Sequence, residues 1–280
     1  MRHMTVGVLN LNQAHLTIDI LQNLARLSPQ DWRVQMILVD NGSLSSDVYQ
    51  LFDWTMSHNS HFAEVLFVSS SSNLGATGGR NIIFNSASGD RILMLDNDVI
   101  LPEDFLWLET LWRRMDKEPR AAIVAPMLVF SDFPHIVQAA GIGLTQQGRV
   151  GYLHRADLVD SIPTTLTEVV ASPTACWLLN RKAQKEVGEL SEEFYPVQYE
   201  DVDFCVRLGL AGWKVLSDRS VHLRHIENVT TKNLEQYPFA RLTVKHGMAF
   251  RKKWKEILLK IATLSDQDIY WAPIPRAKDK

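Results

Sequence analysis

Apolar runs with the length of strands alternate with helical patterns through the first half of the chain, and this alternation limits the possible folds more than any other feature. The runs are TVGVLNLN (residues 5–12), VQMILVD (34–40), EVLFVSS (64–70), RILMLDND (91–98) and AAIVAPMLV (121–129). Helically spaced leucines and isoleucines separate the first two runs, and Pro102 precedes a predicted helix with Glu103 and Asp104 in its first turn. Such apolar strands joined by helices predict an α/β fold, in which helices cover both faces of a mainly parallel sheet.

The second half of the chain has weaker periodicity. Between residues 130 and 167 glycines are frequent and helical signals are few, which predicts extended or hairpin-rich structure beside the sheet. The segment 172–188 then predicts a strand that leads to a short helix. The segment 200–215 predicts a helix that ends near Gly212 and leads to another strand.

Composition narrows the classes of function. A net charge of -3 and a charged fraction of 22% provide no basic field of the kind that attracts nucleic acid, so we expect no nucleic-acid partner. Cys176 and Cys205 are too few for a disulfide framework or a thiolate metal cluster, which favours a reducing compartment. No segment resembles a secretion signal or has the ~18 uninterrupted apolar residues of a membrane span, so a cytoplasmic location is expected.

Polar side chains follow the predicted strands, at the edge of the sheet where α/β proteins bind ligands. Asn10, Asp40, Asn73 and the pair Asp96 and Asp98 occupy such positions. Loops are generally polar, so one such coincidence means little. Four strand ends of this kind predict a cleft.

Asp96 and Asp98 stand one residue apart, just past an apolar strand. The pair suits Mg²⁺ or Mn²⁺, because hard cations prefer oxygen ligands and often share them with a phosphate. Taken alone, the pair is explained more simply as an acidic turn that closes the strand.

Three glycines and an arginine lie upstream of this pair. Gly75, Gly78 and Gly79 allow the backbone to approach a ligand closely, and Arg80 suits a phosphate. Their spacing matches neither the G-x-G-x-x-G of dinucleotide sites nor the G-x-x-x-x-G-K-[ST] of ATPases. Both of these enzyme classes are therefore disfavoured.

Glu200 and Asp201 stand at the start of a predicted helix. There the helix dipole stabilises an ionised carboxylate that is ready to accept a proton. Acidic charge at a helix N-terminus, with Asp203 paired to Arg207 one turn later, also explains this segment without catalysis. We assign Asp203 and Arg207 mainly to that structural role.

Five segments in order resemble the inverting nucleotide-sugar glycosyltransferases of family 2, which have the GT-A fold, and especially bacterial rhamnosyltransferase-like members. They are VDNGS (39–43), NLGATGGRN (73–81), LMLDNDV (93–99), VGELSEEFYPVQYEDVDFCVRLGLAGWKV (187–215) and HLRHIENVTT (222–231). Each motif is modest, but their order and separations are specific. The resemblance covers residues 6–231.

The resemblance implies roles for individual residues. Asp40 is expected to read the nucleotide base in a loop that Asn10 helps to enclose. Asp98 is the expected metal ligand, and Asp96 reaches the ribose, or the metal through water. The remaining implied members are the pocket residues Asn73, Gly79 and Arg80, the catalytic base Asp201 with its neighbour Glu200, and the metal ligand His225, which fits the family spacing better than His222.

The implied activity is transfer of a sugar from a UDP- or dTDP-linked donor to a saccharide or lipid-linked acceptor hydroxyl, assisted by Mn²⁺ or Mg²⁺, in surface polysaccharide or glycolipid assembly. Residues 1–235 form the expected GT-A domain, with the nucleotide-sugar site in 1–130 and the acceptor and catalytic part in 131–235. A nucleotidyltransferase is disfavoured, because it would need a basic, glycine-rich loop after the first strand, and the segment VGVLNLNQAHLT (6–17) contains no lysine or arginine. A non-catalytic binding module is disfavoured by Glu200 and Asp201.

Residues 236–280 are expected to form an amphipathic helical extension. Basic residues alternate with Phe250, Trp254, Ile257, Leu258 and Ile261 between positions 239 and 262, a pattern that suits a helix lying on the inner, anionic face of a membrane. An ordinary helix packed on the catalytic domain or a dimer contact explains the same pattern.

Overall fold

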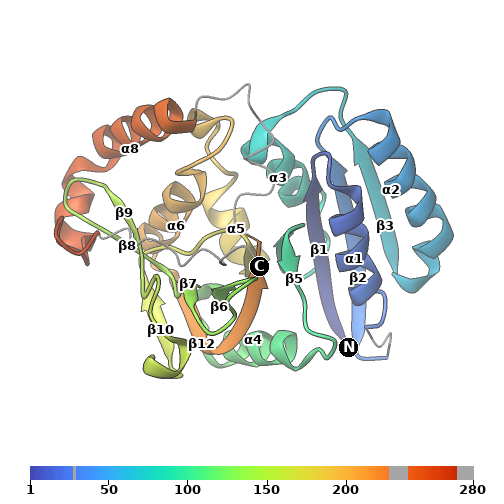
Figure 1. Ribbon diagram of the computed structural model, residues 1–280, viewed down its shortest axis with the longest axis horizontal. Helices are drawn as coiled ribbons and strands as arrows, with labels where there is room; N and C mark the ends of the chain where they lie inside the picture. The colour runs from blue at the N-terminus through green and yellow to red at the C-terminus, as the bar shows by residue number, and fades with distance from the viewer. Residues whose placement is uncertain (28–29, 227–238, 270–280) are drawn as a thin grey trace, which may run out of the picture.

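A mixed sheet of ten strands forms the centre of the protein in a computed structural model that describes residues 1–27, 30–226 and 239–269 (Figure 1). Eight of the strands follow one another from edge to edge: β10 (Leu166–Val169), β12 (Lys214–His225), β6 (Ala121–Phe130), β11 (Cys176–Asn180), β4 (Arg91–Asp96), β1 (Arg2–Asn10), β2 (Trp32–Asp40) and β3 (Glu64–Ser69). The short strands β5 (Val99–Ile100) and β7 (Val137–Ala139) pair with β12 and β6. A separate hairpin contains β8 (Ile142–Leu144) and β9 (Val150–Tyr152).

Helices cover both faces of this sheet. The α-helices are α1 (Ala14–Leu24), α2 (Ser45–His58), α3 (Gly75–Ser86), α4 (Leu106–Lys117), α5 (Arg181–Val187), α6 (Glu200–Leu210) and α8 (Phe239–Ile261). Short 3₁₀ turns occur at η1 (Asn59–His61), η2 (Val159–Ser161) and η3 (Glu192–Phe194). Buried side chains of α1, α2 and α4 share one apolar core with the sheet, and those of α3, α5, α6 and α8 share the other. The predicted α/β architecture is confirmed.

The strand order brings the predicted ligand-binding ends together. Strands β3, β2, β1 and β4 are parallel, and Asn10 pairs in register with Asp40 while Leu9 pairs with Asp96. Strand β11 is inserted antiparallel between β4 and β6, and β12 returns parallel to β6. His225, at the end of β12, therefore reaches the same edge of the sheet, where it pairs with Val99 of β5.

One local prediction needs correction and another agrees with the structure. Helix α4 begins at Leu106, so Glu103 and Asp104 lie before its first turn rather than within it. The Asp104 carboxylate accepts a hydrogen bond from the Leu106 amide at 2.9 Å, which satisfies one of the donors that a helix leaves open at its start. The hairpin-rich structure expected between residues 130 and 167 is present as β7 to β10.

Helix α8 packs beside α6, on the face of the sheet that α6 covers (Figure 1). Phe250 and Leu258 are fully buried in the core that α6 shares, and Trp254, Ile257 and Ile261 are partly buried against it. The five apolar side chains predicted to meet a membrane therefore face the protein. Within the described ranges, no helix is long and apolar enough to cross a bilayer.

Candidate active site

Three potential metal ligands meet at the edge of the sheet. Asp96 ends β4, Asp98 follows it, and His225 ends β12, and one ligand atom from each lies within 4.8 Å of the others. His222, the rejected alternative, is exposed, and its Nε2 atom lies 3.0 Å from the backbone oxygen of Arg219 instead. The predicted Asp96, Asp98 and His225 are thus brought together, although more than 120 residues separate the acids from the histidine in the sequence.

The orientation of His225 fits a cation. Its Nδ1 atom lies 2.7 Å from the carbonyl oxygen Oε1 of Gln138, which only accepts, so Nδ1 carries the proton and Nε2 presents its lone pair. The Nε2 atom lies 3.1 Å from Oδ1 of Asp98. Adjacent ligands of an octahedral ion with bonds of about 2.1 Å are separated by about 3.0 Å. Two oxygens and an imidazole nitrogen suit Mn²⁺ or Mg²⁺, so these residues fit the predicted metal.

Arg80 joins this cluster to the predicted base helix. Its guanidinium is almost fully buried and contacts Oδ1 of Asp96 at 2.7 Å and Oε1 of Glu200 at 3.1 Å. Burial alone would lower the pKa of Arg80, but the two carboxylates outweigh burial and raise it. The arginine therefore stays charged and links the end of β4 to the start of α6.

Glu200 and Asp201 occupy the first turn of α6. Burial and the charge of Asp201 raise the pKa of Glu200 despite the nearby Arg80, and burial raises the pKa of Asp201 to about 6. A carboxylate that titrates near neutrality suits a general base. The second oxygen of Glu200, Oε2, is buried and accepts no hydrogen bond from the part of the chain that the structure describes.

The backbone before Glu200 has an uncommon conformation. Gln198 and Tyr199 have φ angles of 79° and 73°, in the left-handed region that residues with side chains rarely adopt. Such positions concentrate at functional sites and persist only where the surrounding structure holds them. The start of α6 is therefore held in place by its neighbours.

The predicted base-reading residues lie inside the protein. Asn10 and Asp40 are both fully buried, and Nδ2 of Asn10 donates to Oδ1 of Asp40 at 3.0 Å. Asp40 also accepts from the Ser43 amide at 3.3 Å. Asn97, between the two predicted metal-site aspartates, donates to Oδ1 of Asn10 at 3.4 Å and so connects the predicted base pocket to the metal cluster.

Asn73 and Gly79 have different surroundings. Oδ1 of Asn73 accepts from Asn41 at 3.1 Å and from the Gly75 amide at 2.8 Å, which shapes the turn into α3. Gly79 faces the sheet, since a Cβ atom there would lie 2.3 Å from Cδ1 of Leu9. The structure thus gives Gly79 a packing role, and its contact with a nucleotide stays a prediction.

The sequence of this chain matches one known protein family. The family described as "Glycosyl transferase family 2" matches residues 5–188. The chain belongs to that family. The match includes Asp40, Arg80, Asp96 and Asp98, and it ends before Asp201 and His225.

Known structures with the same architecture are glycosyltransferases of the GT-A fold. GalNAc-T7, solved with UDP, GalNAc and Mn²⁺, has a TM-score of 0.69 at 14% identity, over 91% of this chain and 48% of that one. Mannosyltransferase PcManGT from Pyrobaculum calidifontis, solved with GDP-Man and Mn²⁺, has a TM-score of 0.62 at 17% identity, over 91% and 68%. S. aureus TarS 1-349 with UDP-GlcNAc has 0.58 at 15%, over 95% and 69%. At these identities the likeness establishes the GT-A fold of this family 2 chain.

One curated relative has a similar sequence. "Uncharacterized protein y4gI" of Sinorhizobium fredii (strain NBRC 101917 / NGR234) is 24% identical over 236 residues. The match covers 79% of this chain and 24% of the relative, so the chain spans a minor part of that protein's length.

Sequence reasoning about this family 2 chain missed several site residues. Gln138, which orients His225, lies in the irregular segment where nothing in the sequence pointed to it. Asn97 was overlooked although it stands between the two aspartates. The contacts that α8 makes with the start of α6 were missed as well, because Lys253 and Trp254 were counted only as part of an amphipathic pattern.

Proposed function

We propose that this protein transfers a sugar from a nucleoside diphosphate sugar to an acceptor hydroxyl, with inversion at the anomeric carbon. One observation carries the proposal. Arg80 joins the aspartate of the metal cluster to Glu200, beside Asp201, so that a diphosphate site and a proton acceptor share one edge of the sheet. Inverting transfer needs these two features close together, because the attack and the departure occur in one step.

The proton acceptor is Asp201. With a pKa raised to about 6, its carboxylate is largely ionised at neutral pH and is ready to take the proton of the attacking hydroxyl. The unpartnered Oε2 of Glu200 is available to hold a hydroxyl group of a bound sugar in line with that attack. Both groups act at the start of one helix, which is what a defined direction of attack requires.

Asp98 and His225 would hold Mn²⁺ or Mg²⁺, with Asp96 beside them. When bound, the ion supplies positive charge that neutralises the departing diphosphate. Arg80 adds a fixed positive charge, and its bonds to Asp96 and Glu200 keep it in place before the donor arrives. This chain therefore provides a preorganised site for negative charge.

The donor side lies in residues 1–130 and the acceptor side in residues 131–235. We assign the base to Asp40 and Asn10, and the rest of the UDP or dTDP moiety to the loops that contain Asn73, Gly79 and Arg80. Because Asp40 and Asn10 are fully buried, binding the base requires the loop at Ser43 to open. Residues 227–231 of the motif that follows His225 lie outside the described residues.

The acceptor is a saccharide or a lipid-linked saccharide, and the context is surface polysaccharide or glycolipid assembly in the cytoplasm. A rhamnosyltransferase-like subtype is supported by the order of the five motifs. Family membership by itself supports sugar transfer but does not select the sugar or the acceptor.

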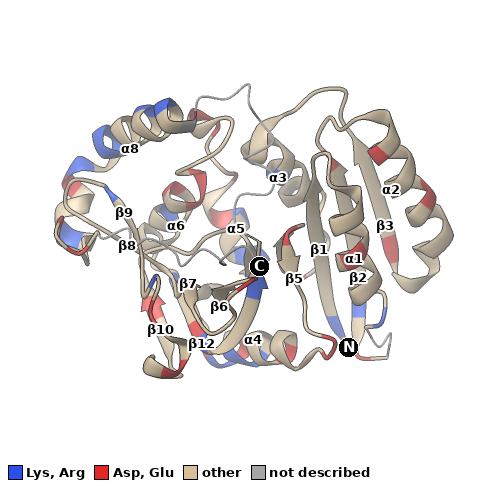
Figure 2. Ribbon diagram, in the orientation of Figure 1, with Lys and Arg blue, Asp and Glu red and all other residues tan. Residues whose placement is uncertain are grey.

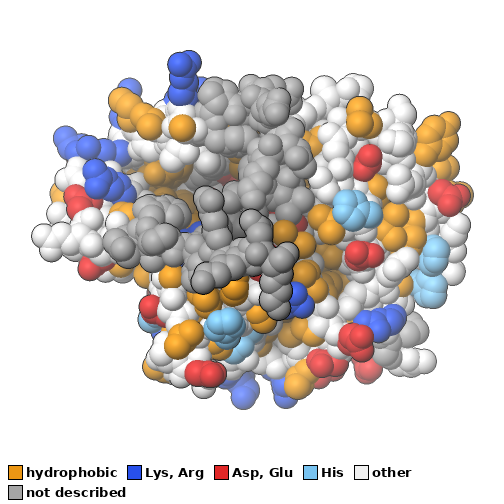
Figure 3. Space-filling model, in the orientation of Figure 1, with side chains coloured by type: hydrophobic (Ala, Val, Ile, Leu, Met, Phe, Trp, Pro, Cys, Tyr) orange, Lys and Arg blue, Asp and Glu red, His pale blue; other side chains and the backbone are white. Residues whose placement is uncertain are grey.

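Contact with a membrane, if the acceptor is lipid-linked, involves the outer face of α8 and not the apolar face predicted from the sequence. Val244, Met248 and Leu259 are 63%, 69% and 64% exposed and follow one another along the helix. Exposed cations lie before and between them, at Arg241, Lys245 and Lys255. Figure 2 marks Lys and Arg positions in blue along α8, and Figure 3 shows basic side chains gathered over this helix. This combination suits an anionic lipid surface.

Thermal unfolding with nucleotides tests the donor and metal site. UDP or dTDP with Mn²⁺ is expected to raise the Tm, because a ligand that binds only the folded state stabilises it. The shift should disappear in Asp98→Ala, which removes a carboxylate of the cluster. Lack of any shift with either nucleotide, with and without Mn²⁺, would contradict the donor assignment.

The base is tested by Asp201→Asn, which keeps the size of the side chain. We expect turnover to fall by at least about 100-fold, since general-base catalysis contributes about 10² to 10⁴. The nucleotide-dependent Tm shift should remain. Oδ1 of Asp201 accepts a hydrogen bond from the Val202 amide at 2.8 Å, within α6 and not from the metal cluster or the predicted base pocket. Unchanged turnover in this variant would remove Asp201 from its role.

A further inference from the structure

The inner face of α8 holds the backbone just before the predicted base. The buried His246 directs Nδ1 at two carbonyl oxygens, of Val197 at 3.0 Å and of Gln198 at 3.2 Å. Since carbonyl oxygens only accept, Nδ1 is the donor to both. Thr243 Oγ1 also donates to Oε1 of Gln198 at 2.6 Å. These contacts fall where the chain enters its left-handed turn at Gln198 and Tyr199.

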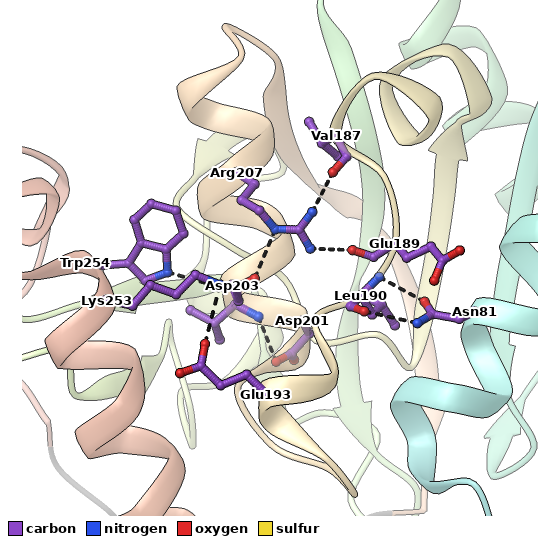
Figure 4. A network of polar contacts seen from close by, with 11 residues as sticks. Asn81, Val187, Glu189, Leu190, Glu193, Asp201, Asp203, Arg207, Lys253 and Trp254 are labelled. Atoms are coloured by element: carbon purple, nitrogen blue, oxygen red, sulfur yellow. Dashed lines mark hydrogen bonds and ion pairs between the residues drawn. The ribbon is translucent and has the colours of Figure 1, made fainter.

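A second set of contacts holds the other end of this turn. The carboxylate of Asp203 is fully buried, and its Oδ1 atom accepts from Nζ of Lys253 at 2.7 Å and from Nε1 of Trp254 at 2.9 Å. Its Oδ2 atom accepts from Arg207 within α6 at 3.0 Å. Figure 4 shows Lys253 and Trp254 reaching Asp203 from α8, with Asp201 two positions before Asp203 in the first turn of α6. Two of the three donors to this carboxylate thus come from another helix.

The tyrosine between these two sets packs on the same helix. The ring of Tyr199 lies 5.3 Å from the ring of Phe250, centre to centre, and a Cβ atom on Gly247 would lie 3.0 Å from the Tyr199 hydroxyl. A tyrosine whose backbone lies in the left-handed region is unfavourable in an isolated chain, and the conformation persists only where the surroundings hold it. Helix α8 holds Tyr199 in three ways. It contacts the backbone before the tyrosine, it packs against the tyrosine ring, and it binds Asp203 after the tyrosine.

We propose that Lys253, Trp254 and His246 are positioning residues for Asp201: through Asp203 and the carbonyl groups at 197 and 198, they keep the start of α6 in the conformation that presents the base to the acceptor. This inference rests on the proposed function, because it gives the contacts a purpose only if Asp201 accepts the proton. Helix α8 lies beyond the segment that matches the family, which ends at residue 188. The start of α6, which α8 contacts, lies beyond that segment as well.

Adjacent lysines on α8 provide a matched test. Lys253→Met removes the cation that contacts Asp203, whereas Lys252→Met removes a neighbouring exposed cation that has no polar partner among the described residues. We expect kcat to fall roughly 10-fold to 100-fold in Lys253→Met, as misplacement of a catalytic group does. Donor KM and the affinity for UDP with Mn²⁺ should stay within about twofold, because those sites lie on other elements. Lys252→Met should match the wild type.

Two more variants separate positioning from general packing. Trp254→Phe keeps an aromatic ring but removes the N–H donor together with part of the ring system, and it should lower kcat in the same way. Lys253→Arg keeps a cationic donor and should recover most of the lost kcat. Equal losses in Lys252→Met and Lys253→Met, or an unchanged kcat in both Lys253→Met and Trp254→Phe, would overturn the proposal.

Amide hydrogen exchange tests the same contacts without a substrate. Exchange of the amides between residues 198 and 204 should be faster in Lys253→Met than in the wild type and unchanged in Lys252→Met. If the wild type transfers no sugar, the proposed function fails, and the exchange result still decides whether α8 holds this turn. Unchanged exchange in Lys253→Met would sink the positioning role whatever the activity.

Discussion

At the scale of single residues, the site contains carboxylates that lie in different surroundings. Asp96 faces the charged Arg80, while burial raises the pKa of Asp201. Because the two acids have different surroundings, one is suited to attract positive charge and the other to accept a proton. The difference comes from where the chain buries each of them and not from their chemistry.

The raised pKa of Asp201 predicts the pH dependence of transfer. Only the ionised carboxylate accepts a proton, so kcat/KM should rise with pH through about 6 and become flat above that value. A steady-state profile between pH 5 and 8 measures this. The affinity for UDP with Mn²⁺ at each pH serves as the control, since a loss of donor binding would lower that affinity as well. A flat profile through pH 6 would contradict the assignment.

The same raised pKa predicts that the base destabilises the protein. The folded state holds the Asp201 proton more tightly than the unfolded chain, so this residue lowers stability as pH rises from about 4 to about 6, and the loss is complete above that range. Asp201→Asn should therefore be more stable than the wild type at pH 7.5, by about 1 to 3 kcal/mol. The difference in Tm should shrink as the pH is lowered toward 4. A variant that is less stable at every pH would disagree with this account.

At the scale of elements, close packing of helices on strands determines how the site loops are placed. Helix α3 lies against β1 because Gly79 leaves room for Leu9, and Gly7 of β1 leaves room for Ile83. The loop before α3 carries Asn73, and α3 itself carries Arg80. The glycines thus act on the site by setting the distance between a helix and the sheet.

Two glycines in helices should respond oppositely to alanine. Gly79→Ala should destabilise the protein by about 1 to 3 kcal/mol, because a Cβ atom 2.3 Å from Leu9 forces the core to shift. Gly209→Ala should stabilise it by about 0.5 to 1 kcal/mol, since that position in α6 has nothing within 4 Å of an added Cβ. Denaturant unfolding of both variants measures the contrast. Equal effects would mean that packing on β1 does not place α3.

Much of the architecture was predictable from the sequence, because apolar periodicity and strand-end polarity are local signals. The strands from β1 to β4 and the cluster of Asp96 and Asp98 were found in this way. Their meeting with His225 was inferred only from the resemblance, because the antiparallel insertion of β11 and the return of β12 have no local signal. Which face of α8 packs on the protein depends on tertiary contacts. The apolar face that was predicted to meet a membrane, with Phe250 and Leu258, is buried against the protein instead.

At the scale of the whole molecule, the outer face of α8 is at the opposite end from α2 (Figure 1). We expect the protein to sediment with vesicles that contain anionic lipid, and to do so less at high salt, because cations and exposed aliphatic side chains share this face. Val244→Ser with Met248→Ser should lower binding several-fold. Leu44→Ser with Met56→Ser, which removes exposed apolar side chains near α2, should not. Equal binding to neutral vesicles, or none to anionic ones, would exclude this contact.

The unbroken sheet beneath the proposed donor and acceptor parts limits how those parts can move. Strand β11 comes from the second half of the chain but is hydrogen-bonded to β4 on one side and β6 on the other. The two parts therefore cannot rotate about a hinge without breaking strand pairing, as two-lobed enzymes do when they close on a substrate. Because the sheet does not move, we expect short loops to open for the donor and to release the nucleotide after transfer. The turnover rate should therefore depend on the mobility of those loops.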